Sequence, residues 1–284
     1  MSRIAYVAGQ YVMHRQAAVH IEDRGFQFAD GVYEVIAVRG GGLVDAERHL
    51  YRLKRSLGEL RIPAPLGDAA INIVLREVIR RNGVDTGIVY LQITRGGAPR
   101  DHAFPKAVKP TLVVTARRSR LPDPRLGEDG IAIITIPDIR WQRCDIKSVA
   151  LIANVLGKQQ AREAGAYEAW QVDHAGNITE GTSTNAWIVT AEGAVVTRAA
   201  DTAILNGVTR LAIFDIIRRE GYEVVERPFT VEEAKRAREA FLTSTTADLL
   251  PVVRIDGAPV GEGKPGPLGQ KLRAAYVAHA AAPA

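Results

Sequence analysis

The sequence predicts a mixed α/β chain of two domains, and three observations lead to this. Residues 4 to 39 contain short runs of alternating apolar and polar residues broken by turn signals, which is typical of an antiparallel sheet. The stretch that begins at Ser119, SRLPDPRLGEDG, is rich in proline and glycine and predicts a linker. Beyond it, longer apolar strand patterns alternate with helix patterns. We therefore expect an N-terminal domain over 1–118, a linker over 119–125 and a C-terminal domain over 126–284.

The first domain contains two predicted helices between its strands. Asp45 is a candidate N-cap, and the leucines after it follow helical spacing. A second helix is expected from Asp68 to the Asn82-Gly83 stop signal. Strands follow at 88–94 and 110–116. In the strand that begins near Tyr33, alternation places Tyr33 and Glu34 on opposite faces, so one can face a cavity while the other supports the sheet.

The second domain is expected to contain strands at IAIITI, EAWQV, NAWIV, AVV, FLT and PVVRI. Helix patterns lie between them at 149–164 and 209–220. At 284 residues with 46% apolar content, the chain is long enough for two domains that each bury a core.

Composition excludes several classes of function. The net charge is +5, but the arginines are dispersed and often adjoin acidic residues, and no basic run is interleaved with aromatics. A site for small anionic ligands explains local arginines as well as nucleic-acid binding does. No zinc, P-loop or dinucleotide motif is present, and no metal site is expected. The single cysteine, Cys144, cannot form an internal disulfide. Because no long apolar run and no signal-peptide core are found, we expect a cytoplasmic protein without membrane contact.

Lys147 lies in the most informative stretch, RWQRCDIKSVALIANVLGKQQAREAG. Only eight of the 37 basic residues are lysines, so this position stands out. It follows a strand pattern at 131–139 and precedes a helix pattern in which Leu151, Ile152, Val155 and Leu156 share one face. Partial desolvation at such a junction would make the neutral amine available for Schiff-base chemistry, which arginine cannot supply. A lysine taken alone is far more often an ordinary surface residue that caps a loop.

A second stretch, NITEGTSTNAW, makes the interpretation of Lys147 more specific. Glu180 opens a run of small hydroxyl residues, Thr182, Ser183 and Thr184, before a strand resumes. The pairing of CDIKS with TEGTSTN resembles the fold-type IV aminotransferases that use pyridoxal 5′-phosphate, the group that holds D-amino acid and branched-chain aminotransferases. The resemblance covers nearly the whole chain, and it implies a small N-terminal α/β sandwich-like domain and a larger C-terminal pseudo-barrel that binds the cofactor.

The resemblance also implies the roles of the cofactor residues. Lys147 would hold the cofactor as a Schiff base and then carry the proton between the substrate Cα and the cofactor, while Glu180 would keep the pyridine nitrogen protonated. The kinetics would be ping-pong. Contacts with the cofactor and its phosphate are implied for Arg52 in HLYRL, Thr184, Val208 and Thr209 in ILNGVTR, and Ser244 and Thr245 after FLT.

The substrate residues follow from the same resemblance. D-amino acid aminotransferases carry an Arg-x-His pair that traps the substrate carboxylate across a dimer interface, and Arg100 and His102 match that pair. Tyr33 completes the trap in relatives, and Val35 is placed with it at the substrate. Branched-chain enzymes of this fold lack the pair. One departure is Ala37, where some D-specific relatives carry a basic residue.

We therefore expect a homodimeric D-amino acid aminotransferase of the D-alanine type that uses pyruvate or 2-oxoglutarate as acceptor. Three alternatives stay open at this stage. They are a branched-chain or (R)-amine aminotransferase, a 4-amino-4-deoxychorismate lyase that shares the fold and the lysine, and a nucleotide- or cofactor-binding protein without catalysis.

Overall fold

The computed structural model describes residues 3–120 and 123–281, which divide into two units by their internal contacts. The first unit holds the described residues up to 120 together with 146–150 and 280–281, and the second holds 123–145 and 151–279. Residues 146–150 thus pack with the first unit, although the predicted boundaries place them in the second domain. Of the predicted linker 119–125, residues 121 and 122 lie outside the described residues.

The first unit is built on a six-stranded sheet in the order β2-β1-β6-β5-β3-β4. All neighbouring strands are antiparallel, as the alternating patterns predict. The strands are β1 (Ile4–Val7), β2 (Gln10–Met13), β3 (Gly31–Arg39), β4 (Gly42–Leu43), β5 (Gly87–Thr94) and β6 (Thr111–Arg118).

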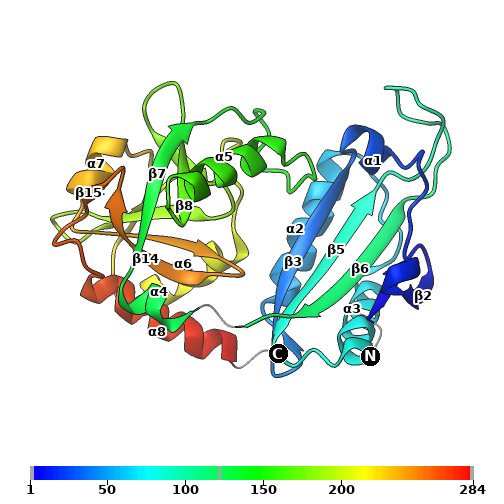
Figure 1. Ribbon diagram of the computed structural model, residues 1–284, viewed down its shortest axis with the longest axis horizontal. Coiled ribbons are helices and arrows are strands. Elements are labelled where there is room, and N and C mark those ends of the chain that lie inside the picture. The colour runs from blue at the N-terminus through cyan, green and yellow to red at the C-terminus, as the bar shows by residue number, and fades with distance from the viewer. Residues whose placement is uncertain (1–2, 121–122, 282–284) are drawn as a thin grey trace. The chain divides into compact units, whose positions relative to one another are not determined.

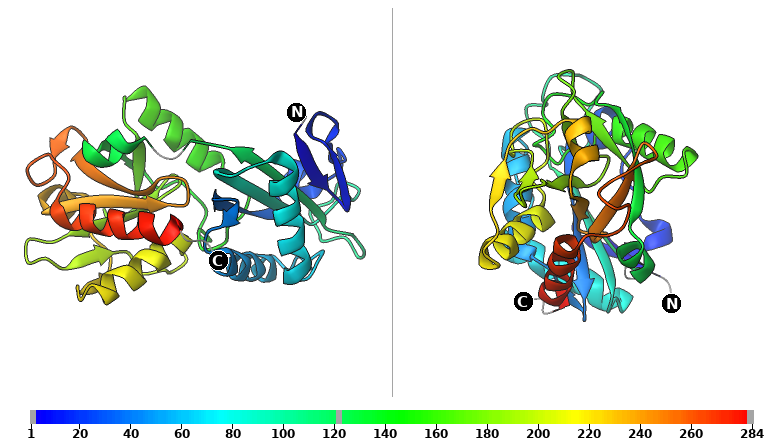
Figure 2. Two further views of the ribbon diagram at one scale, coloured as in Figure 1. Left: turned by 90° about the horizontal axis from the view of Figure 1, so that it is seen from below. Right: turned by 90° about the vertical axis from the view of Figure 1, so that its left-hand side faces the viewer.

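Two long helices pack on this sheet, α2 (Ala46–Glu59) against β3 and α3 (Asp68–Asn82) against β6 and β1 (Figure 2). Their apolar stripes and the facing strand residues form one buried core. Asp45 precedes α2 as predicted, but its backbone is left-handed, with φ 52°, and its side chain does not cap the helix. Gly83 ends α3 as predicted, with φ 56°. Two short helices, η1 (His14–Gln16) and α1 (Arg24–Phe28), precede β3.

The segment 146–150 runs along β3 and pairs with it through the backbone. Ser148 forms an antiparallel bridge with Val32, and the Tyr33 amide donates to the Lys147 carbonyl at 3.0 Å. The Lys147 amide donates to Ser56 Oγ on α2 at 3.2 Å. The main chain of Lys147 is therefore fixed between a strand and a helix of the first unit.

The second unit is built on a nine-stranded sheet in the order β12-β11-β10-β13-β14-β7-β8-β9, with β15 on β14. The sheet is mixed, and β9 lies beside β10 although the two are far apart in this order, so the sheet curls (Figure 1). The strands are β7 (Ile131–Pro137), β8 (Glu168–Val172), β9 (Ile178–Gly181), β10 (Asn185–Val189), β11 (Val195–Thr197), β12 (Val224–Glu226), β13 (Glu239–Ser244), β14 (Asp248–Ile255) and β15 (Ala258–Pro259).

The helices described in this unit are α4 (Pro124–Glu128), α5 (Ile152–Glu163), α6 (Val208–Arg219), α7 (Val231–Arg236) and α8 (Pro267–Ala281). Helix α5 follows the lysine segment where the sequence predicts it. Its apolar residues Ile152, Val155 and Leu156 are exposed, however, by 72%, 58% and 52%. The helix packs through its small residues instead, and a Cβ on Gly157 would come 2.5 Å from Ile136 Cδ1.

Candidate active site

Lys147 reaches one face of β3 in the first unit. Its side chain is half-buried, and Nζ lies 4.3 Å from the centroid of the Tyr33 ring. Tyr33 in turn stacks on Tyr90 of β5, with 5.7 Å between ring centroids. Burial, with a smaller contribution from Tyr33, raises the pKa of Tyr90 to about 12, so its hydroxyl stays protonated and donates to Gln92. The candidate nucleophile is thus placed against an aromatic pair.

The alternation predicted for β3 is present. Tyr33 and Val35 are half-buried on the face that Lys147 contacts, whereas Glu34 is fully buried on the opposite face, beneath α2. Arg52 donates Nε to Glu34 Oε1 at 2.8 Å and Nη2 to Oε2 at 2.7 Å, and His49 Nδ1 lies 2.7 Å from Oε2. The arginine predicted to bind phosphate is therefore held in a two-bonded ion pair.

The pKa values of Glu34 and His49 determine the charges in this buried group. Burial alone would raise the pKa of the Glu34 carboxyl, but the charge and hydrogen bonds of Arg52, with the bond from His49, hold it at about 2. Burial lowers the pKa of His49 from its ordinary value, and this outweighs the attraction of Glu34. At neutral pH the group consists of a carboxylate, a guanidinium and a neutral imidazole.

Arg100 and His102 lie on the long loop between β5 and β6, and both are exposed. The structure brings them together on one aromatic ring. The Arg100 guanidinium carbon lies 4.6 Å from the centroid of the Phe28 ring, and the His102 ring centroid lies 5.3 Å from it. The two side chains are therefore close together, while their role as a pair that binds a carboxylate stays a prediction.

Glu180 lies on β9 of the second unit and is only 6% exposed. Its Oε1 accepts from Arg140 Nη1, and its Oε2 accepts from Asn185 Nδ2 at 3.0 Å and from the Leu205 amide at 3.1 Å. Arg140 also donates to Asp138, at 3.0 and 2.7 Å. Burial opposes the charge on Arg140, but the two carboxylates outweigh it and raise the pKa of that guanidinium. Three donors thus fix the direction of the Glu180 carboxylate.

Asn185 connects Glu180 to the predicted phosphate residues. Its Nδ2 also donates to the Leu205 carbonyl at 2.9 Å, and a Cβ on Gly207 would come 2.1 Å from its Oδ1. Only glycine permits this approach of the α6 N-terminus. Asn185 is also paired with Thr243 of β13, so Ser244 and the half-buried Thr245 follow at the same end of the sheet.

These residues fit a cofactor that carries a heterocyclic nitrogen and a phosphate. Thr184 Oγ1 is buried and, among the described residues, has no hydrogen-bond partner. Helix α6 begins at Val208 and Thr209 without a side-chain cap or an acidic residue in its first turn. Exposed amides at a helix N-terminus favour an anion, and the carboxylate of Glu180 favours a protonated ring nitrogen. Thr209 donates to or accepts from the Tyr276 hydroxyl at 3.3 Å.

The interpretation of the sequence missed three residues of this arrangement. Arg140 and Asn185 hold Glu180. Arg140 lies four residues before CDIKS, and Asn185 is the last residue of TEGTSTN. The third is Glu168, a fully buried residue of β8 that accepts from the hydroxyls of Thr182 and Ser183 and so holds the turn before Thr184. Asn185 could have been found from its place in the TSTN motif, whereas Glu168 has no motif.

Cys144, which lies near the lysine in sequence, is not a nucleophile at neutral pH. Burial raises the pKa of its thiol to about 12 despite the attraction of Arg140, and the thiol donates to the Trp141 carbonyl.

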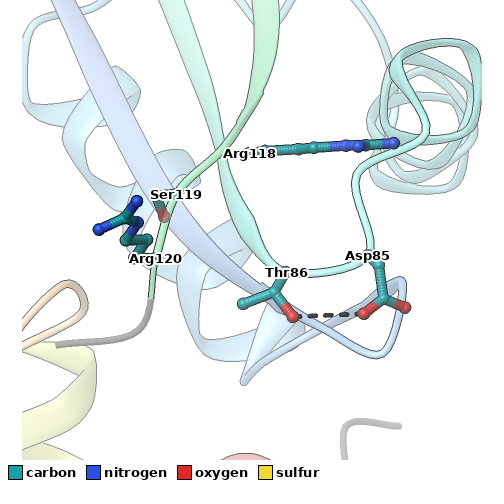
Figure 3. Close-up of a pocket in the computed structure, with 5 residues that line it drawn as sticks. All are labelled: Asp85, Thr86, Arg118, Ser119 and Arg120. Atoms are coloured by element: carbon teal, nitrogen blue, oxygen red, sulfur yellow. Dashed lines mark hydrogen bonds between the residues drawn. The ribbon is translucent and has the colours of Figure 1, made fainter. Parts of the chain in front are cut away.

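A surface hollow of the first unit contains none of the predicted site residues (Figure 3). It is lined by Asp85, Thr86, Arg118, Ser119 and Arg120. Nowhere in the described ranges does a helix combine the length and apolarity needed to cross a bilayer.

Comparison with known proteins places this geometry in a family. The chain is 39% identical over 267 residues to the D-alanine aminotransferase of Bacillus licheniformis, covering 94% of this chain and 93% of that protein. It is 40% identical over 273 residues to the D-alanine aminotransferase of Staphylococcus haemolyticus, covering 95% of each. A solved branched-chain amino acid aminotransferase from T.th., with pyridoxamine 5′-phosphate, superposes with a TM-score of 0.89 at 25% identity, covering 99% of this chain and 95% of that chain.

The family model described as amino-transferase class IV matches residues 31–255, which include Lys147 and Glu180. The chain belongs to the class IV aminotransferases, the pyridoxal-phosphate enzymes of fold type IV.

Proposed function

We propose that this protein is a pyridoxal-phosphate-dependent aminotransferase that moves the amino group of a D-amino acid, of the D-alanine type, to a 2-oxo acid. The similarity to two D-alanine aminotransferases over nearly the whole chain supports the activity. The structural observation that carries the proposal is Glu180, a buried carboxylate whose two oxygens are held by Arg140, Asn185 and a backbone amide. Such a fixed anion suits a protonated ring nitrogen.

When bound, pyridoxal phosphate supplies an aldehyde for condensation with amines and a ring that accepts the electrons of the broken Cα–H bond. Lys147 is the residue proposed to attach to it. Once displaced by the substrate amine, Lys147 Nζ acts as the base that takes the proton from the substrate Cα. The pairing of its main chain with β3 fixes the starting point of this side chain, and Tyr33 limits its range.

The phosphate is proposed to lie at the N-terminus of α6, against the amides of Val208 and Thr209. The unpartnered hydroxyl of Thr184 supports this, as does the hydroxyl pair Ser244 and Thr245 at the end of β13. Arg52 is proposed to contribute its positive charge from the first unit. Its two bonds to Glu34 fix the direction of the guanidinium.

The substrate carboxylate is proposed to bind Arg100 and His102, with the Tyr33 hydroxyl as a further donor and Val35 beside the side chain. Arginine offers a two-pronged fork that matches a carboxylate. Both loop residues are exposed in the single chain, which agrees with their use on a surface that a second subunit completes.

We also propose that the enzyme is a homodimer in the cytoplasm. Three apolar side chains of α5 are exposed in the second unit, and Ile21 and Phe26 are each 76% exposed in the first. Exposed apolar groups of this kind mark interaction surfaces. Light scattering of the holoenzyme should give twice the chain mass, and a monomer would contradict this part of the proposal.

The decisive experiment uses purified holoenzyme. Borohydride treatment followed by peptide mass spectrometry should place a pyridoxyl group on the peptide that contains Lys147, and Lys147→Ala should abolish both the label and activity. Activity should then be compared with D-alanine, L-leucine and (R)-1-phenylethylamine, with pyruvate and 2-oxoglutarate as acceptors. A preference for L-leucine or the amine would refute the D-amino acid assignment, and release of 4-aminobenzoate from aminodeoxychorismate would indicate a lyase instead.

A further inference from the structure

Arg24 lies beneath the loop that carries Arg100 and His102, in the first unit. It is the first residue of α1 and is only 3% exposed. Its Nη1 donates to the Asp101 carbonyl at 2.5 Å and its Nη2 to the His102 carbonyl at 3.3 Å. The guanidinium therefore bonds the main chain of the loop at the two residues that follow Arg100. Figure 1 shows α1 beside this loop, which joins β5 to β6.

Asp30 holds the guanidinium of Arg24 in place. Its Oδ2 accepts from Arg24 Nε at 2.8 Å and from Arg95 Nε at 2.7 Å, and its Oδ1 accepts from Arg95 Nη2 at 3.0 Å. Burial opposes the charge, but the bonds from Arg95 and Arg24 hold the pKa of Asp30 below its ordinary value. The carboxylate thus stays ionised and bridges two arginines.

Arg95 fixes the base of the same loop. It donates to the carbonyls of Leu60 and Arg61 at the end of α2, at 2.8 and 3.0 Å. Its guanidinium carbon lies 3.6 Å from the centroid of the Phe104 ring, which belongs to the same loop. Arg95 therefore ties the base of the loop to the end of α2, and the Asp30 carboxylate links Arg95 to Arg24.

The side chains of Arg24 and Arg100 also share a ring. Their guanidinium carbons lie 4.8 and 4.6 Å from the centroid of Phe28, the last residue of α1, and His102 packs on the same ring. Helix α1 is itself fixed by Asp23, whose carboxylate accepts from the Gly25 amide and from Thr94 Oγ1, each at 2.8 Å. These contacts, which orient the Arg100–His102 pair, come from residues that were not assigned to the site.

We propose that Arg24, fixed by Asp30, is a positioning residue for the substrate carboxylate, because it holds the main chain of Asp101 and His102 and so sets the directions of the Arg100 and His102 side chains. This inference rests on the proposed role of Arg100 and His102 in binding the carboxylate. Arg24 does not touch the substrate. Its effect passes through the main chain of the loop. A displacement of about 1 Å in the binding side chains is enough to weaken an oriented interaction strongly.

The test measures kcat and KM for D-alanine in the holoenzymes of Arg24→Met, Arg24→Lys, Arg100→Ala and the double variant Arg24→Met/Arg100→Ala. Arg80→Met is the matched control, since Arg80 is 72% exposed on α3 and pairs only with Glu77 among the described residues. We expect Arg24→Met to raise KM about tenfold while kcat stays within about twofold, which is the signature of lost substrate binding. The absorbance of bound cofactor should not change.

Arg24→Lys keeps the charge but lacks the fork that reaches two carbonyls, so its KM should rise nearly as much. The double variant should raise KM by clearly less than the product of the two single effects, because Arg24 acts in part through Arg100 and for the rest through His102. The control should behave as the unsubstituted enzyme does.

Four outcomes would overturn the inference. If Arg100→Ala raises KM but the Arg24 variants do not, the inference fails while the proposed carboxylate site stands. If Arg100→Ala itself is silent, the carboxylate site fails and this inference fails with it. If the two KM effects multiply in the double variant, Arg24 acts elsewhere. If both Arg24 variants lose bound cofactor or do not fold, the group of Arg24, Asp30 and Arg95 is needed for folding alone.

Discussion

Replacing Glu34 by glutamine should destabilise the protein in a pH-dependent manner. The carboxyl is fully buried, and its pKa is held at about 2 against an ordinary 4.5. Since a tenfold change in proton affinity corresponds to about 1.4 kcal/mol, ionised Glu34 contributes about 3 kcal/mol at neutral pH. Removing one partner of a buried pair typically costs about 3–5 kcal/mol, which agrees with this magnitude.

The sign of the pH dependence follows from the lowered pKa. The stabilisation is fully present above pH 4.5 and is lost as the pH falls toward about 2, because the unfolded chain then takes up the proton first. His49 acts in the same direction, since its lowered pKa means that acidification protonates the unfolded chain before the folded one. The loss at acidic pH should therefore begin near the ordinary pKa of histidine and steepen below 4.5.

Urea unfolding of the unsubstituted protein and of Glu34→Gln, at several pH values between about 3 and 7.5, measures this difference. Glu77→Gln is the matched control. The pKa of Glu77 is also lowered to about 2 by two arginines, but this pair lies at the surface, where solvent screens it. Glu34→Gln should lose stability at neutral pH, and the loss should shrink on acidification, while Glu77→Gln should change little. Equal effects of the two substitutions, or a gap that widens as the pH falls, would refute the reasoning.

Three further outcomes are expected. Arg140→Met should destabilise the protein by roughly 3–5 kcal/mol in urea, because it removes the partner that the half-buried carboxylate of Asp138 shares with the buried carboxylate of Glu180. A change below about 1 kcal/mol would argue against this network. Gly207→Ala should weaken cofactor binding at least about tenfold in a spectrophotometric titration, because the added Cβ would displace the Asn185 side chain. Gly58→Ala on α2 is the control and should leave binding unchanged, since open space surrounds Gly58. Cys144→Ser should leave kcat and KM unchanged because the thiol is protonated at neutral pH, and a loss of activity of about tenfold would show that the sulfur takes part.

Much of the fold could be predicted because its signals are local. The strand alternation around Tyr33 and Glu34, the stop at Gly83 and the position of α5 depend on neighbouring residues, and the structure confirms them. The cofactor motifs are also short and continuous. Their assignment to the class IV family is confirmed by the family match, while the role of each residue stays a prediction.

What could not be predicted depends on contacts between distant residues. The bond between Arg52 and Glu34 joins a helix to a strand, and nothing in either segment indicates the partner. The pairing of 146–150 with β3 is backbone hydrogen bonding, which carries almost no sequence signal. Periodicity on α5 indicated a shared apolar face but not that this face is exposed while Gly157 makes the packing contact.

Residues 146–150 limit how the chain can be divided into separately folded fragments. The five residues around Lys147 complete the edge of a sheet whose other strands end before residue 119, yet the residues on either side of them belong to the second unit. A fragment that stops at residue 120 would lack both Lys147, whose amine is proposed to react, and the peptide that covers β3. The Tyr33 amide and the Gly31 carbonyl would then be open to solvent or to another strand. Expression of the two halves as separate polypeptides should therefore yield an aggregation-prone first half, and recovery of activity would need a donor peptide that restores the missing edge.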